Sequence, residues 1–129
     1  MWGAFNATST AVGSGSTGLA TKAAKTQPWS ESFIIEFPED GTYTFAAVGG
    51  SFSIEQVVTE SAAGSMTLEV QIDGAALGGS PNAVSTSRDT QAHDSDNTHS
   101  DGQDLSFVVS AASGCERASI TLIGTETLA

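Results

Sequence analysis

Oxygen ligands are concentrated in the polar stretch before Leu105, which is the part of the chain best suited to hold a cation. Asp94, Asp96 and Asp101 are interspersed there with hydroxyl and amide side chains, a spacing that is typical of calcium loops. An EF-hand loop starting at Asp94 requires glycine at its sixth position and glutamate at its twelfth, but His99 and Leu105 stand there. The sequence therefore predicts a solvated polar segment without a dedicated metal site, and the three aspartates are the residues open to an adventitious Ca²⁺ or Mg²⁺.

Residues for nucleophilic catalysis are present without the patterns that activate them. No G-x-S-x-G turn occurs, and Cys115 has only Arg117 nearby to stabilise a thiolate, so we expect a partly buried cysteine in a turn. Residues 13–18 match G-x-G-x-x-G but lack the flanking strand and helix that dinucleotide binding needs. We predict no enzymatic activity, catalytic residue or cofactor. An enzyme is favoured only if His93 or His99 is buried beside a carboxylate, and a glycosidase carboxylate pair stays an open alternative.

The charge balance argues against polyanionic partners. Four lysines and arginines stand against 15 acidic residues, which gives a net charge of −11 and an isoelectric point near 4.1. Nucleic-acid binding needs a basic patch to neutralise phosphates, and an anionic membrane surface repels such a chain. The sequence contains no signal-peptide pattern and no apolar stretch of membrane-spanning length. We therefore expect a soluble protein that folds in a cytoplasm, without nucleic-acid or membrane partners.

From Ser32 onward, apolar residues alternate with polar ones, which predicts β-strands with one buried face. No stretch of a dozen residues follows the helical period. Asp73-Gly74 comes directly after the most regular alternation and predicts a two-residue hairpin turn. The residues predicted to face inward, with Gln56 as an interruption, are Phe33, Ile35, Phe37, Tyr43, Phe45, Ala47, Phe52, Ile54, Val58, Met66, Leu68, Val70, Ile72, Leu105, Phe107, Val109, Ala118, Ile120 and Leu122.

One alternating sheet would leave its apolar face in water, so two sheets must pack on each other. The sequence therefore predicts an all-β fold, an antiparallel β-sandwich of jelly-roll or immunoglobulin-like type over residues 30–129. Residues 89–102 are polar and alternate only weakly. They form either a long loop or thin edge strands whose charges discourage further pairing.

Residues 1–29 differ in composition from the rest of the chain. They are rich in glycine, alanine, serine and threonine, and neither the helical nor the strand period fits them. Their only charges are two lysines, whereas the remaining residues hold all 15 acidic residues against two arginines. This asymmetry favours an extended N-terminal arm that lies on a partner or on a neighbouring copy. The residues expected to make that contact are Trp2, Phe5, Leu19, Lys22, Lys25 and Trp29.

The second half of the chain carries a series of short motifs. Residues 66–79 combine the regular strand with Asp73-Gly74 and Ala76-Leu77-Gly78-Gly79, and a Ser/Thr-rich strand follows at residues 82–87. Gly102-Gln103-Asp104 and Ser113-Gly114-Cys115-Glu116 complete the series. Over roughly half of the chain, this pattern resembles a small β-sandwich found in virion proteins of tailed bacteriophages.

The resemblance implies a structural virion protein, most simply a capsid decoration (cement) protein. Such a protein would bind the major capsid protein on the outer surface of the head, and we expect a homo-oligomer, a trimer, made in the host cytoplasm. Many copies on a symmetric lattice would add up their modest contacts through avidity. The alternative is a head- or tail-fibre or spike module that binds a host receptor or carbohydrate, for which exposed aromatic residues are expected.

Overall fold

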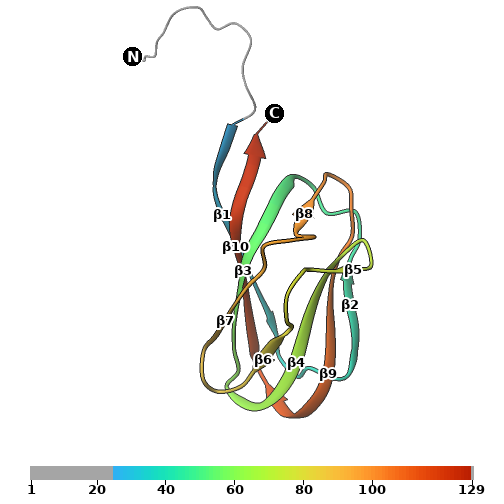
Figure 1. Cartoon of the computed structure of the whole chain (residues 1–129). Helices are drawn as coiled ribbons and strands as arrows, with labels where there is room; N and C mark the ends of the chain where they lie inside the picture. The colour runs from blue at the N-terminus through green and yellow to red at the C-terminus, as the bar shows by residue number, and fades with distance from the viewer. Residues whose placement is uncertain (1–24, 129) are drawn as a thin grey trace, which may run out of the picture.

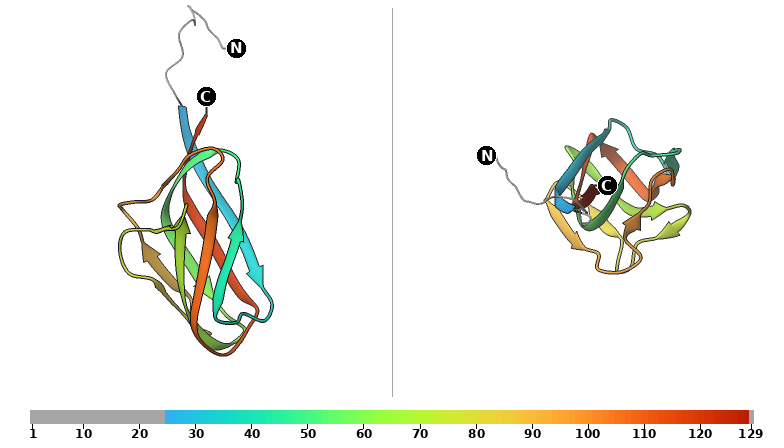
Figure 2. Two further views of the ribbon diagram at one scale, coloured as in Figure 1. Left: turned by 90° about the vertical axis from the view of Figure 1, so that its right-hand side faces the viewer. Right: turned by 90° about the horizontal axis from the view of Figure 1, so that it is seen from above.

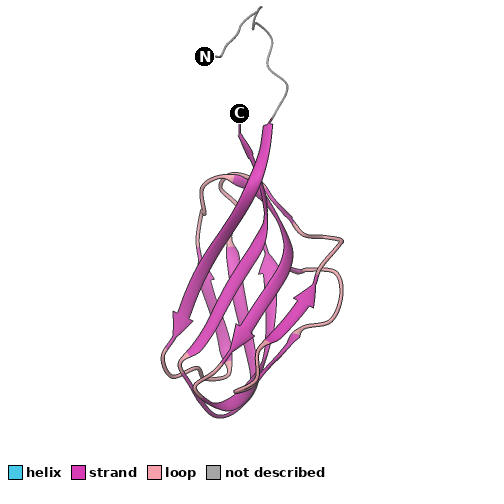
Figure 3. Ribbon diagram, turned by 90° about the vertical axis from the view of Figure 1, so that its left-hand side faces the viewer, coloured by secondary structure: helices cyan, strands magenta, loops and turns pink. Residues whose placement is uncertain are grey.

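The computed structural model describes residues 25–128, and the secondary structure in that range consists of β-strands alone (Figure 3). No helix long and apolar enough to cross a membrane is found among these residues. The strands, in chain order, are β1 (Lys25–Ile35), β2 (Gly41–Phe45), β3 (Ser51–Glu60), β4 (Ala63–Ile72), β5 (Ala75–Ala76), β6 (Asn82–Val84), β7 (Asp89–Ala92), β8 (Thr98–His99), β9 (Leu105–Glu116) and β10 (Ala118–Leu128).

Two antiparallel sheets pack face to face, which confirms the predicted β-sandwich (Figures 1 and 2). The first sheet has the order β1-β10-β3-β7, and β8 also pairs with β3. The second sheet has the order β2-β9-β4-β5, and β6 also pairs with β4. The 11-residue β1 and the five-residue β2 therefore form one edge of each sheet, whereas strands of two to four residues form the other edges.

The core lies between the sheets and consists of the alternating apolar side chains of the central strands. In β4, β9 and β10 the predicted inward faces are confirmed, because every predicted residue there is buried. Removing this apolar surface from water is the main term that stabilises the sandwich, at about 25 cal/mol per Å². The confirmed residues are Met66, Leu68, Val70, Ile72, Leu105, Phe107, Val109, Ala118, Ile120 and Leu122.

In β3 the prediction that Val58 faces inward is wrong, because a β-bulge shifts the alternation by one residue. Along β10, Ile123 pairs with Gln56 but the next residue pairs with Ile54, so one residue of β3 has no partner. After the bulge, Val57 and Thr59 are buried in place of Val58. The polar Gln56, an interruption in the sequence pattern, is thus the residue at which the strand changes face.

Gly124 is required at this bulge by the close approach of the backbone of β3. A Cβ atom at position 124 would overlap the carbonyl oxygen of Ser53. The glycine also pairs with Trp29 of β1 and leaves the space beside that residue free.

The Asp73-Gly74 hairpin is confirmed by the pairing on both sides of it. Ile72 pairs with Ala75, and the two intervening residues have φ values of +54° and +84°. A two-residue turn with both φ values positive matches the right-handed twist of the flanking strands, and Asp-Gly adopts it with little strain.

Two further residues predicted to face inward do not do so, because their strands end earlier. β1 ends at Ile35, and Phe37 lies in the following turn with 71% of its side chain exposed. β2 ends at Phe45, and Ala47 has a φ of +54° in a turn where its amide donates to the Asp104 carboxylate.

The predicted boundary at residue 29 is too late in the chain, because β1 already includes Lys25. Lys25 pairs with Leu128 and Trp29 with Gly124, so both residues belong to the sheet and not to an arm. The other predicted arm residues, Trp2, Phe5, Leu19 and Lys22, lie outside the described residues. For residues 89–102, the structure selects thin edge strands, β7 and β8, over a long loop.

Candidate binding cleft

An apolar cleft of about 250 Å³ opens between β1 and β2, on the side of the sandwich where both strands are edges. Its position follows from the topology, because no further strand within residues 25–128 covers the gap between the two sheets there. Aromatic rings dominate its walls, and Glu31 is the one charged residue among the described lining residues. The lining consists of Trp29, Glu31, Phe33, Phe45, Val48, Gly49, Phe52 and Leu105.

The turn between β1 and β2, residues 36–40, holds the two edges together. The backbone amide of Glu39 donates to the Tyr43 hydroxyl at 3.0 Å, and the Asp40 carboxylate accepts from the Ala112 amide at 2.9 Å. Glu36 adds an exposed ion pair with Arg117 at 3.5 Å. These contacts join the turn to β2, to β9 and to the connection between β9 and β10.

One wall of the cleft is a stack of three rings. Trp29 reaches across Gly124 onto Phe52 with a ring-centroid distance of 4.2 Å, and Phe52 stacks on His99 at the same distance. Trp29 is partly exposed, whereas Phe52 and His99 are buried. Gly124, the partner of Trp29 in β10, adds no side chain to the strand that lies between Trp29 and Phe52.

His99 anchors this stack from behind. Its ring is fully buried, with Nδ1 2.9 Å from the Gly50 carbonyl oxygen and Nε2 2.9 Å from the Gln103 carbonyl oxygen. Both nitrogens face backbone carbonyl oxygens, and the N–H of the neutral ring donates to one of them, which fixes the plane of the ring and links the connections before β3 and β9. A histidine held in this way has a structural role rather than a proton-transfer role.

The opposite wall is a cluster of three phenylalanines. The ring centroids of Phe33 and Phe45 are 5.2 Å apart, and each lies 5.0–5.7 Å from Phe107 in an edge-to-face arrangement. Phe107 is buried, but 42% of Phe45 is exposed at the mouth of the cleft. Such pairs add to the energy of area burial and keep the wall rigid.

The chemistry of the cleft is that of binding. Its rings offer flat apolar surfaces for another ring or an aliphatic side chain, and the Glu31 carboxylate at the mouth can accept hydrogen bonds or attract a cation. Sequence reasoning named Trp29 as a contact residue but missed the cleft, since its walls come from strands that meet only in the folded chain.

The candidate cation ligands do not form a cluster. Among residues 25–128 no group of three or more His, Cys, Asp or Glu side chains is placed to hold a metal ion. Asp101 instead accepts a hydrogen bond from the Gly50 amide at 2.7 Å. Asp94 and Asp96 are exposed in the connection between β7 and β8.

The condition that would favour an enzyme is not met by either histidine. Both are buried, yet their hydrogen-bond partners in the structure are backbone carbonyl groups: Gly78 for Nδ1 of His93, and the two carbonyls described above for His99. The absence of an enzymatic activity stays a prediction.

Cys115 lies in β9 and is buried, not in a turn as the sequence suggests. Burial raises the pKa of its thiol, the Glu116 carboxylate raises the pKa further, and a hydrogen bond with Ser61 lowers it in part. A thiol in this environment is a poor nucleophile.

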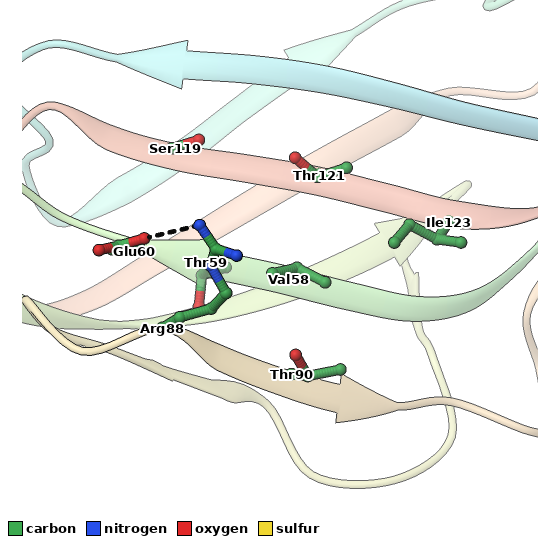
Figure 4. Close-up of a pocket in the computed structure, with 8 residues that line it drawn as sticks. All are labelled: Val58, Thr59, Glu60, Arg88, Thr90, Ser119, Thr121 and Ile123. Carbon is green, nitrogen blue, oxygen red and sulfur yellow. Dashed lines mark hydrogen bonds and ion pairs between the residues drawn. The ribbon is translucent and has the colours of Figure 1, made fainter.

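A second depression, of about 400 Å³, lies on the outer face of β3 and β10 (Figure 4). Its walls are mostly hydroxyl groups, including those of Thr90 and Thr121, and an exposed ion pair between Arg88 and Glu60 at 3.4 Å borders it. It has no aromatic ring, so it offers a ligand less apolar contact than the cleft does.

Comparisons with known proteins leave the function to be argued from this geometry. No protein-family model and no curated protein matches the chain. Among solved structures, a family two carbohydrate esterase from Cellvibrio japonicus is similar with a TM-score of 0.35 and 15% sequence identity. The alignment covers 82% of this chain but 36% of the esterase chain, and a likeness this distant carries no argument about activity.

Proposed function

We propose that the protein is a structural virion protein of a tailed bacteriophage, a capsid decoration protein that binds the outer coat lattice and stabilises the head. The proposal starts from the resemblance of residues 65–129 to phage virion sandwiches. In this proposal the chain consists of an acidic β-sandwich domain and an N-terminal attachment segment. It forms a homo-oligomer, for which the sequence predicts a trimer. The oligomer contacts the major capsid protein.

The observation that carries the proposal is the ribbon formed by β1 and β10. Its outer end extends beyond the sandwich, where Lys25 pairs with Leu128 (Figure 1). Residues 1–24 are therefore joined to the body at a point remote from the sandwich, which suits a segment that makes contacts with other subunits. A projecting two-stranded ribbon of this kind suits attachment to another subunit better than it suits catalysis.

Cosedimentation with empty heads of the corresponding bacteriophage tests this function. We expect the full chain to sediment with the heads, and deletion of residues 1–24 to weaken binding at least tenfold because an anchored segment supplies the contact. Arg88→Ala, on the outer face of the sandwich and away from the outer end of the ribbon, is the matched control and should bind normally. Failure of the full chain to bind heads contradicts the proposal, and full binding by the truncated chain contradicts the role of the segment.

The alternative, a receptor- or carbohydrate-binding module, is favoured by one specific observation. The cleft presents partly exposed Trp29 and Phe45, and aromatic rings are the side chains on which sugar rings stack. Binding to glycans or to host cells, lost on Trp29→Ala and retained by Arg88→Ala, would select this function over head binding.

A further inference from the structure

We propose that the cleft between β1 and β2 binds residues 1–24 of a neighbouring copy of this chain, with an aromatic side chain of that segment inserted between the two ring walls. This inference rests on the proposed homo-oligomer. It assigns the contact to the cleft of one copy and to residues 1–24 of another. The outer-face depression near Arg88 is a weaker candidate, because it has no aromatic ring on which a side chain of the segment could stack.

The exposed apolar side chains are unevenly distributed over the described part of the molecule. Among the described residues, the large exposed ones all lie on β1, on its neighbour β10, or on β2 and the turn before it: Ile34, Phe37, Phe45, Ile123 and Leu128. Isolated exposed apolar residues are normal on a protein surface, but a grouping on one side indicates an interaction surface. Of these residues, Phe45 lines the cleft itself, Phe37 and Leu128 lie near the two ends of the β1–β10 ribbon, and Ile34 and Ile123 lie on its outer face.

The unpaired edge of β1 is long. β1 has 11 residues and pairs only with β10 among the described strands, so its other edge has unpaired backbone groups. The outer strands on the opposite side, β5 to β8, have two to four residues each. Short strands protect an edge, whereas a long one can accept an added strand. Pro28 removes one amide and leaves the stretch from Trp29 onward, beside the cleft, as the accepting part.

The occupant is indicated by charge and side-chain chemistry. Residues 1–24 contain no acidic residue and one lysine, whereas residues 25–129 hold all 15 acidic residues. A segment without carboxylates can approach Glu31 and the acidic body without the repulsion that two bodies would experience. Trp2 and Phe5 supply rings that match the aromatic walls, and the intervening small residues suit an extended backbone.

A neighbouring copy, rather than the same chain, is indicated by where the segment starts. Lys25 lies at the outer end of the ribbon, four residues beyond Trp29, so β1 runs from outside the body toward the cleft (Figure 1). The preceding residues must reverse direction to reach their own cleft. A fully extended segment of 24 residues spans up to about 80 Å, which is ample to reach the cleft of an adjacent copy.

Cross-linking between two different full-length variants tests the contact. Both carry Cys115→Ser; one also carries Phe5→Cys and the other Val48→Cys, which places a thiol at the cleft. We expect mild oxidation of the mixture to give a disulfide-linked heterodimer at least tenfold more abundant than with the matched control, in which Ile34→Cys, on the outer face of β1, replaces Val48→Cys. Equal yields with Val48→Cys and Ile34→Cys, or a disulfide that forms only within a chain carrying both cysteines, would overturn the proposal.

Sedimentation equilibrium of the full chain gives a second readout. Trp2→Ala combined with Phe5→Ala should weaken self-association at least tenfold, and Ile34→Ala should leave it unchanged. Unchanged self-association of the double variant would contradict the inference. Both experiments use purified protein without heads. Failure here with normal head binding therefore rejects this contact alone, whereas intact cross-linking without head binding rejects the decoration function alone.

Discussion

The cleft between β1 and β2 and the polar segment of residues 89–104 contrast in composition and in role. The polar segment contains the residue types that are typical of catalytic and metal sites, namely aspartates and histidines. Several of them instead form hydrogen bonds with backbone groups. The cleft contains aromatic residues that a sequence would assign to a core, yet it leaves some of them open. In this molecule, residue type alone is a poor guide to which side chains stay open to solvent and which satisfy the backbone.

The contrast has a physical cause in how each region is held. In the polar segment, the connections cross the end of the sandwich without long strands, so buried amides and carbonyls need side-chain partners. Asp104 accepts from the Ala47 amide, and Asn97 donates to the carbonyl oxygens of Ile54 and His93. At the cleft, β1 and β2 pair on one side with β10 and β9, and among the described residues neither their outer edges nor several of their side chains have a partner.

The largest expected effect tests whether His99 is structural. His99→Ala removes the ring beneath Phe52 and the N–H donation to a buried carbonyl, and should lower the free energy of unfolding by about 3 kcal/mol. His99→Phe keeps the stack and loses only the donor, so its loss should be smaller. Chemical denaturation measures both, with Thr98→Ala as control. A His99→Ala protein of normal stability would remove the basis for the contrast.

The next effect sharpens the description of the open side. Gly124→Ala forces a Cβ onto the Ser53 carbonyl oxygen and should cost about 2 kcal/mol in the free energy of unfolding. It should also change the fluorescence of Trp29, whose ring lies over position 124. Gly49→Ala is the matched control, because its nearest atom is an Asp101 carboxylate oxygen at 3.8 Å, and its cost should stay below about 0.5 kcal/mol. Equal costs for the two variants would argue against a tight bulge.

A smaller effect concerns Cys115, which belongs to neither region. Its raised pKa means that the native thiol is less ionised at pH 8 than an exposed thiol, so native alkylation by iodoacetamide should be at least tenfold slower than in denaturant. The unfolded chain ionises first as pH rises above about 8.5, so this group should lower stability in that range. Cys115→Ser should abolish the alkylation. Equal rates in the native and denatured chains would contradict the burial of the thiol.

The smallest effect marks the limit of surface electrostatics. The Arg88–Glu60 ion pair is exposed on both sides, so Arg88→Ala should change the free energy of unfolding by no more than about 0.5 kcal/mol. Thermal unfolding at low and at high salt measures it. A loss of more than 1 kcal/mol would indicate that this exposed ion pair near β7 contributes more to the free energy of unfolding than surface ion pairs usually do.

Much of the fold follows from the sequence, and little of the candidate site does. The faces of β4, β9 and β10 could be predicted because alternation is a local property of neighbouring residues. Val58 was misassigned because the bulge depends on how β3 meets β10, which no local pattern encodes. The start of β1 was placed too late because Lys25 to Trp29 become a strand only by pairing with β10.

The sequence by itself determined the all-β class, the central inward faces and the Asp73-Gly74 turn, since these depend on side-chain period and on the φ values that single residues accept. Tertiary structure alone decided that Trp29 stacks on Phe52 and Phe52 on His99, and that β1 meets β2 to form a cleft. These contacts join residues far apart in the chain. Their energies exist only when both sheets are in place, and so no stretch of sequence contains them.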